Sequence, residues 1–154
     1  MTIDIVVTML LPPDFHLHYH GIDVKSAKKE TFSDKEKARL QREKEALGKL
    51  GWTWQLMLSN PYQAHELSNC LVMFRTIRDQ DVVGQYNEAH MFADYLLTRS
   101  TEGRMSSVMS RVAKQLGISV DRAHQLFAIA VSFGMLRVDH TQPLMPDKDL
   151  HLLR

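Results

Sequence analysis

The sequence contains a single cysteine, Cys70, among its 154 residues. One cysteine cannot form an intramolecular disulfide or a cysteine-based zinc finger, so the chain must fold without either. Charge of one sign is also lacking, because the formal net charge is only +1. A charge this small gives no overall attraction to nucleic acid, and any contact with a polyanion must come from a local basic patch.

Long apolar runs and recognisable catalytic patterns are absent from the sequence as well. No run approaches the roughly 20 apolar residues that cross a bilayer. The apolar opening at 3–11 carries Asp4 and stops at Pro12-Pro13, which is untypical of a signal peptide. We therefore expect a cytoplasmic protein without membrane association. We find no phosphate loop, nucleophile-base pair or paired carboxylates, so we expect neither an enzyme nor a cofactor.

The composition is that of a folded globular protein, and a chain of this length holds at most two compact modules. The β-branched run at 3–8 predicts a strand, and residues 15–24 predict a second strand that forms a hairpin with it. Ser33 precedes Glu36 by three residues, which predicts a capping box and a helix that ends near Lys49. The N-terminal region is thus expected to begin with a strand pair.

The middle of the chain is predicted to be helical. Apolar residues at 52–58 form a cluster that must be buried. Asn60-Pro61 then predicts the start of a helix that runs to about Arg78. We expect the core-facing stripe of this helix to consist of the apolar residues at helical spacing, which are Leu67, Leu71, Phe74 and Ile77, with Cys70 and Met73 alongside.

A natural break at 79–84 follows this helix. We place the domain boundary there, between an N-terminal region at 1–84 and a C-terminal domain at 85–154. Apolar periodicity, with serines as caps, predicts three helices in the C-terminal domain, at 87–98, 106–116 and 119–133.

The second and third of these helices are joined by a tight turn at 117–119, and two strands are expected at 135–139 and 149–153. This order resembles the winged helix-turn-helix domain of transcription regulators. In that family a small residue, here Ala113, lies early in the second helix, and a glycine, here Gly117, opens the turn. The resemblance implies a mainly α, α+β protein: an N-terminal strand pair, a helical middle and a C-terminal winged helix-turn-helix domain.

The same resemblance implies sequence-specific binding of double-stranded DNA. The third helix would enter the major groove with His124 among its outward positions, where Arg122 would read guanine and Gln125 adenine. The serine, arginine and lysine residues around it would contact phosphates. The DNA-binding residues that we predict are Ser106, Ser107, Arg111, Lys114, Ser119, Arg122, His124, Gln125, Arg104, Arg137 and Lys148.

The third helix departs from the family by being apolar nearly all round from Leu126 onward. Either the N-terminal segment or a second chain must cover this face, and we place a homodimer interface at Ile129 and Val131. The predicted function is a DNA-binding regulator of transcription or replication, such as a phage or mobile element would encode. The alternative is a protein-binding module on the same scaffold that inhibits or assembles a host complex. The apolar third helix, the near-zero net charge and the pair Trp52 and Trp54 favour it.

Three histidines alternate along the second predicted strand, at His16, His18 and His20, and so share one face. Such a face could bind zinc or nickel. Because the sequence places no carboxylate or cysteine nearby, we expect an exposed strand face without a metal.

Overall fold

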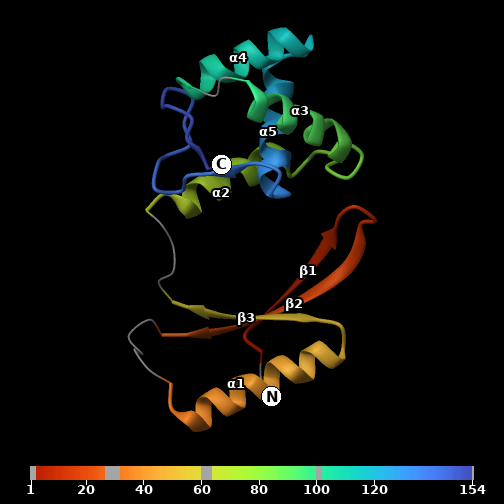
Figure 1. Cartoon of the computed structure of the whole chain (residues 1–154), viewed down its shortest axis with the longest axis vertical. Coiled ribbons are helices and arrows are strands. Elements are labelled where there is room, and N and C mark those ends of the chain that lie inside the picture. Colours follow the sequence, from red (N-terminus) through yellow and green to blue (C-terminus); the bar gives the residue numbers. More distant parts are fainter. Residues whose placement is uncertain (1–2, 27–31, 60–63, 100–101, 154) are drawn as a thin grey trace. The chain divides into compact units, whose positions relative to one another are not determined.

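The computed structural model describes residues 3–26, 32–59, 64–99 and 102–153. The chain folds as two compact units, Met1–Pro61 (unit 1) and Tyr62–Arg154 (unit 2), which together make an α+β protein (Figure 1). The sequence placed the division near residue 84. The helix before that point instead packs on the C-terminal helices, so it belongs to unit 2.

Unit 1 contains a three-stranded sheet. β1 (Ile5–Leu11) and β2 (His16–Lys25) pair antiparallel, which confirms the predicted hairpin. β3 (Thr53–Leu58) pairs parallel with the other side of β2. Sequence reasoning missed β3 and expected only a buried cluster there, because a parallel partner that is distant in sequence leaves no local turn signal.

The helix α1 (Asp34–Lys49) connects the parallel strands β2 and β3. It begins at the predicted capping box, in which the Glu36 carboxylate accepts a hydrogen bond from the Ser33 N–H at 3.0 Å. At its other end Leu47 is 1% exposed, and a Cβ placed on Gly21 of β2 would lie 2.9 Å from Leu47 Cδ1. Glycine at this position therefore lets the helix approach the sheet closely.

We expect Leu47→Ala to destabilise unit 1 strongly. Removing a buried leucine side chain usually costs about 2 to 5 kcal/mol, and the only other buried apolar side chains described in this unit are Ile22 and Leu40. Amide hydrogen exchange should show faster exchange throughout β2 and β3. Leu50→Ala is the matched control, because Leu50 follows the same helix and is 66% exposed. Unchanged protection of β2 in Leu47→Ala would contradict this account of the core.

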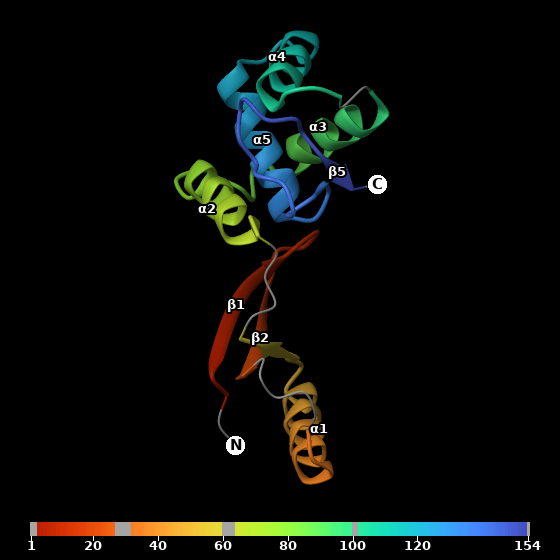
Figure 2. The same ribbon diagram turned by 90° about the vertical axis from the view of Figure 1, so that its left-hand side faces the viewer.

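Unit 2 has four helices among its described residues: α2 (Glu66–Ile77), α3 (Tyr86–Thr98), α4 (Met105–Leu116) and α5 (Val120–Ser132). α5 lies between α2 and α3 and also contacts α4 (Figure 2). The short strands β4 (Arg137–Val138) and β5 (Leu152–Leu153) pair antiparallel after α5. The three predicted helices and the closing strand pair are confirmed, although both strands are shorter than expected. None of the described helices is both long and apolar enough to cross a membrane.

The turn between α4 and α5 follows the chemistry that its residues predict. Gly117 ends α4 with a φ of 68°, in the left-handed region that glycine adopts without strain. Ser119 caps α5 by accepting a hydrogen bond from the Arg122 N–H at 3.1 Å. The start of α4 differs from expectation, because Arg104 is its N-cap and the two predicted cap residues, Ser106 and Ser107, lie in its first turn.

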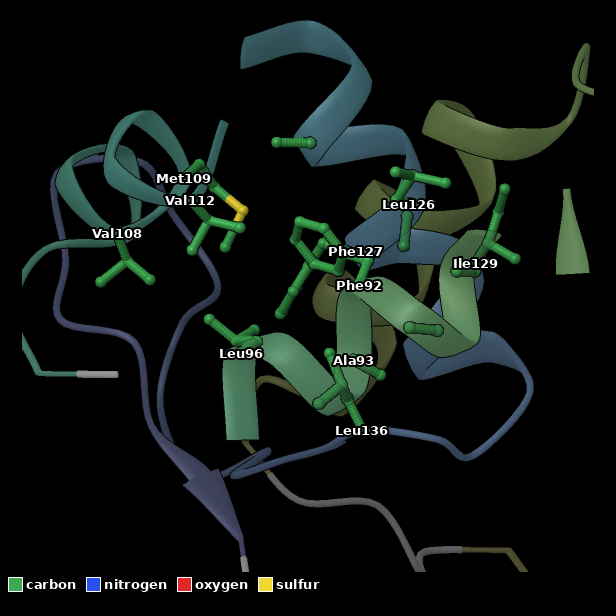
Figure 3. Close-up of a cluster of buried hydrophobic side chains, with 14 of the residues drawn as sticks. Phe92, Ala93, Leu96, Val108, Met109, Val112, Leu126, Phe127, Ile129 and Leu136 are labelled. Atoms are coloured by element: carbon green, nitrogen blue, oxygen red, sulfur yellow. The ribbon is translucent and has the colours of Figure 1, made fainter. Parts of the chain in front are cut away.

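The core of unit 2 lies where α3, α4 and α5 meet. Phe92, Met109 and Phe127, one from each helix, are fully buried there (Figure 3). Ile129 belongs to the same cluster and is completely buried, with Met73 of α2 also in the cluster. The face that the sequence assigned to a dimer at Ile129 is therefore covered from within one chain, and Val131 packs beside it half-buried.

The helix α2 buries only part of the stripe that the sequence predicted. Asn69 and Met73 are buried, and Ile77 packs against the core. The rest of the predicted stripe is exposed, namely Leu67, Leu71 and Phe74. The prediction for these three residues was wrong because Asn69 is buried through its hydrogen bonds to Gln142 and Leu144. The spacing of apolar residues gives no indication of such a polar contact. The predicted start at 60–61 lies outside the described residues.

Candidate nucleic-acid interface

The outer face of α4 carries hydroxyl and basic side chains. Four exposed residues share one side of the helix: Ser107 and Lys114 each lie three and four residues from the adjacent pair Ser110 and Arg111. Together with the half-buried Ser106 they line a shallow, open hollow of about 460 Å³. These five residues are called the α4 surface below. They include no carboxylate, so the hollow presents cations and hydroxyl groups.

The backbone at the start of α4 is already hydrogen-bonded. The Met105 N–H donates to the Lys148 carbonyl at 2.8 Å, and the Ser106 N–H donates to the Pro146 carbonyl at 3.0 Å. These two N–H groups cannot also bind a phosphate, as the free start of a helix would. Ser106 therefore has its hydroxyl, and no backbone donor, to offer a ligand.

The C-terminal segment runs beside the start of α4. Arg104 and Asp149 form an isolated β-bridge, and the Leu150 N–H donates to the Gly103 carbonyl at 3.0 Å. Arg104 and Lys148 are both exposed at this end of α4. Two further predicted contact residues thus lie next to the α4 surface, whereas Arg137 is exposed on β4.

Within α5 the N-terminal end is accessible, and the only other exposed residue is Ser132 at the C-terminal end. Val120 and Asp121 are exposed, and the next polar residues, Arg122, His124 and Gln125, are half-buried. Every residue from Leu126 to Ala130 is buried. The helix therefore cannot lie lengthwise in a major groove, and a groove contact is limited to its first two turns.

The side chain of Arg122 is held by α3. Its guanidinium forms an ion pair with both carboxylate oxygens of Glu88, with Nε at 3.2 Å from one of them. It also donates to Gln85 Oε1 at 2.7 Å and to Gln125 Oε1 at 3.3 Å. Both side chains that the sequence assigned to base reading, Arg122 and Gln125, therefore have partners in their own chain. Before Arg122 can contact a base, its ion pair with Glu88 must open.

Partial burial lowers the pKa of His124, and the nearby Asp121 carboxylate opposes this effect only in part. A depressed pKa means that the fold favours the neutral ring. The stabilising contribution is complete above the ordinary histidine pKa of about 6.5 and is lost as the pH falls from there through the folded-state value.

We therefore expect the free energy of unfolding of unit 2 to decrease less between pH 7.5 and pH 5 in His124→Gln than in the wild type. Urea denaturation at a series of pH values measures this difference. An NMR titration that places the His124 pKa above its ordinary value would contradict the expectation. His16→Gln is a suitable control, because His16 is exposed on β2 and belongs to unit 1.

Asn69 of α2 fixes the loop between β4 and β5. It is 2% exposed, its Nδ2 donates to the Gln142 carbonyl at 2.9 Å, and its Oδ1 accepts from the Leu144 N–H at 2.8 Å. The His65 N–H also donates to the His140 carbonyl at 3.2 Å. Sequence reasoning missed Asn69, because a single amide in an amphipathic helix belongs to no motif.

Asn69→Ala is expected to lower the free energy of unfolding of unit 2 by about 1 to 3 kcal/mol, because it leaves the buried Leu144 N–H without its partner. Amide exchange at Leu144 should become faster than in the wild type. Ser68→Ala is the matched neighbour, since the Ser68 hydroxyl bonds to the His65 carbonyl at an exposed position. Equal losses in the two variants would show that the amide does not anchor the loop.

Two of the three histidines on β2, His18 and His20, lie within hydrogen-bond distance of side chains on β3, whereas His16 is exposed. His18 Nε2 and His20 Nδ1 lie 2.8 Å and 2.7 Å from Thr53 Oγ1 on β3, and His20 Nε2 lies 3.4 Å from Gln55 Oε1. In the part of the chain that the structure describes, no three histidine, cysteine or acidic side chains come together to hold a metal ion.

No protein-family model matches the chain, and no curated protein is similar enough to count as a relative.

Proposed function

We propose that this protein binds double-stranded DNA through the α4 surface and the N-terminal end of α5. The α4 surface carries this proposal, because an open hollow lined by three serines, Arg111 and Lys114 offers the groups that contact DNA phosphates. Phosphate contacts by arginine and lysine supply the sequence-independent part of DNA affinity. They also suit a protein with a small net charge, since Arg111 and Lys114 line the hollow together and no carboxylate lines it with them.

The order of elements in unit 2 supports a winged helix-turn-helix domain as the scaffold for this binding. α4 and α5 meet at a left-handed glycine turn, α3 packs behind them, and β4 and β5 close the unit. The bridge between Arg104 and Asp149 adds a third short extended segment beside the closing pair. Within the proposal the protein is a cytoplasmic, sequence-specific regulator of transcription or replication, and the first turns of α5 supply the base contacts.

The proposal depends on phosphate contacts at α4 rather than on base reading by Arg122. We expect Arg111→Ala and Lys114→Ala each to weaken duplex binding and to reduce the slope of log affinity against log salt by about one unit. Fluorescence anisotropy with a labelled duplex at several salt concentrations measures both effects. The control is Lys44→Ala, which removes the same charge from an exposed position on α1.

Two results would overturn the proposal. One is wild-type protein that shows no salt-dependent binding to any duplex, since phosphate contacts must release counterions. The other is an equal loss of affinity in Lys44→Ala and Lys114→Ala, which would mean that overall charge and not the α4 surface is responsible.

Docking of another protein is a second candidate function, favoured by an apolar groove between α3 and the turn that follows α4. The groove has a volume of about 280 Å³ and is lined by Glu88, Met91, Phe92, Tyr95, Leu116, Ile118 and Leu126. Met91 is 73% exposed at its edge. Exposed methionine beside an apolar hollow is typical of surfaces that accept protein partners. Such docking would be lost in Met91→Glu and would not require Lys114.

A further inference from the structure

The outer strand β1 has an unpaired edge. The strand order of the sheet is β1-β2-β3, and among the described strands β1 pairs with β2 alone (Figure 1). Its seven residues, IVVTMLL, contain no charged residue and no proline. Several of its large apolar side chains are exposed by 36% to 48%, namely Ile5, Val6, Val7 and Leu10.

Natural proteins usually protect an edge strand with lysine, proline, a bulge or a covering segment, because free backbone N–H and C=O groups pair readily with another strand. β1 carries none of the protective residues, and its alternate side chains are apolar on both faces of the sheet. Pairing with another strand would therefore satisfy the free backbone groups of β1 and bury its exposed apolar side chains at the same time.

We propose that β1 pairs antiparallel with β1 of a second copy of this chain, which joins two three-stranded sheets into one sheet of six strands. The sequence of β1 is self-complementary about Thr8, its only polar residue. Around a two-fold axis at Thr8, Val7 lies opposite Met9 of the second copy, and the remaining pairs match in the same way, Val6 with Leu10 and Ile5 with Leu11. Opposite residues in antiparallel strands share a face, so every apolar side chain meets another apolar side chain.

The other edge of the sheet lacks this symmetry. A corresponding pairing of β3 about Leu56 would set the Gln55 amide against Met57. Gln55 and Thr53 are also engaged with the histidines of β2. Self-complementarity therefore distinguishes β1 from β3.

The helix α1 leaves room for a second copy beside β1. α1 packs over β3 and over Gly21 of β2, through Leu47. The register between β1 and β2 places Val6 opposite Gly21, so Val6 and Leu10 share the face that α1 covers farther along the sheet. Both side chains are nevertheless 48% exposed. This inference does not rest on DNA binding, and it supplies a self-association surface in place of the buried Ile129.

Thr8→Cys in a Cys70→Ser background tests the proposed register. Opposite Cα atoms in an antiparallel pair are about 4.5 to 5.5 Å apart, which lies within the range that a disulfide spans. Mild oxidation should therefore convert Thr8→Cys protein to a covalent dimer. Gln55→Cys on β3, in the same background, is the control and should stay a monomer. Cys70 is exposed, so its replacement should leave the fold intact. Equal cross-linking of the two variants would overturn the proposal.

A pair of opposite charges introduced at facing positions tests the same interface without a covalent bond. Val6→Lys and Leu10→Glu should each weaken self-association by roughly tenfold or more in sedimentation equilibrium, because each sets a charge against an apolar side chain. The double variant should recover most of the affinity, since each lysine then faces a glutamate of the second copy. Far-ultraviolet circular dichroism checks that each variant folds. A wild-type protein that stays monomeric at its highest soluble concentration, or a double variant as weak as the singles, would overturn the proposal.

Discussion

Unit 2 depends on the complete burial of the middle of α5. Five consecutive residues, Leu126 to Ala130, are removed from solvent, and a helix can be buried on all sides only if neighbours contact each side. α2, α3 and α4 together meet this requirement. The same burial decides what a ligand can reach, because it leaves only the first turns of α5 beside the exposed face of α4. The surface chemistry of the unit is thus a consequence of its core.

Unit 1 has a smaller hydrophobic core than unit 2, and much of its sheet is exposed. Leu47 and Leu40 of α1, with Ile22 of β2, are its buried apolar residues among those described. The helix α1 packs on β3 and beside Gly21 of β2, and several apolar side chains of β1 remain exposed. Because Gly21 has no side chain, α1 can approach β2 closely at that position. The helix does not cover the exposed apolar side chains of β1.

Features that depend on neighbouring residues could be predicted from the sequence. The capping box at Ser33, the glycine turn at Gly117 and the cap at Ser119 all follow from residues a few positions apart. Features that depend on distant residues could not, as β3 and the buried face of α2 illustrate. The candidate site divides in the same way. The α4 surface follows from the helical spacing of its residues. In contrast, nothing near Arg122 in the sequence indicates that Glu88 forms an ion pair with it.

Any ligand that binds Arg122 at this end of α5 must first displace Glu88 from its ion pair with the guanidinium. The guanidinium already donates to both Glu88 oxygens, to Gln85 and to Gln125, so a ligand must replace the Glu88 carboxylate to bind it. A single neutral acceptor binds the guanidinium too weakly to displace a carboxylate. A phosphate, or the O6 and N7 atoms of guanine, can accept two hydrogen bonds from it at once. Glu88 would then be left without its cation beside an anionic ligand. Within the proposed DNA complex, Glu88 would therefore favour ligands that offer Arg122 two acceptors over ligands that offer one.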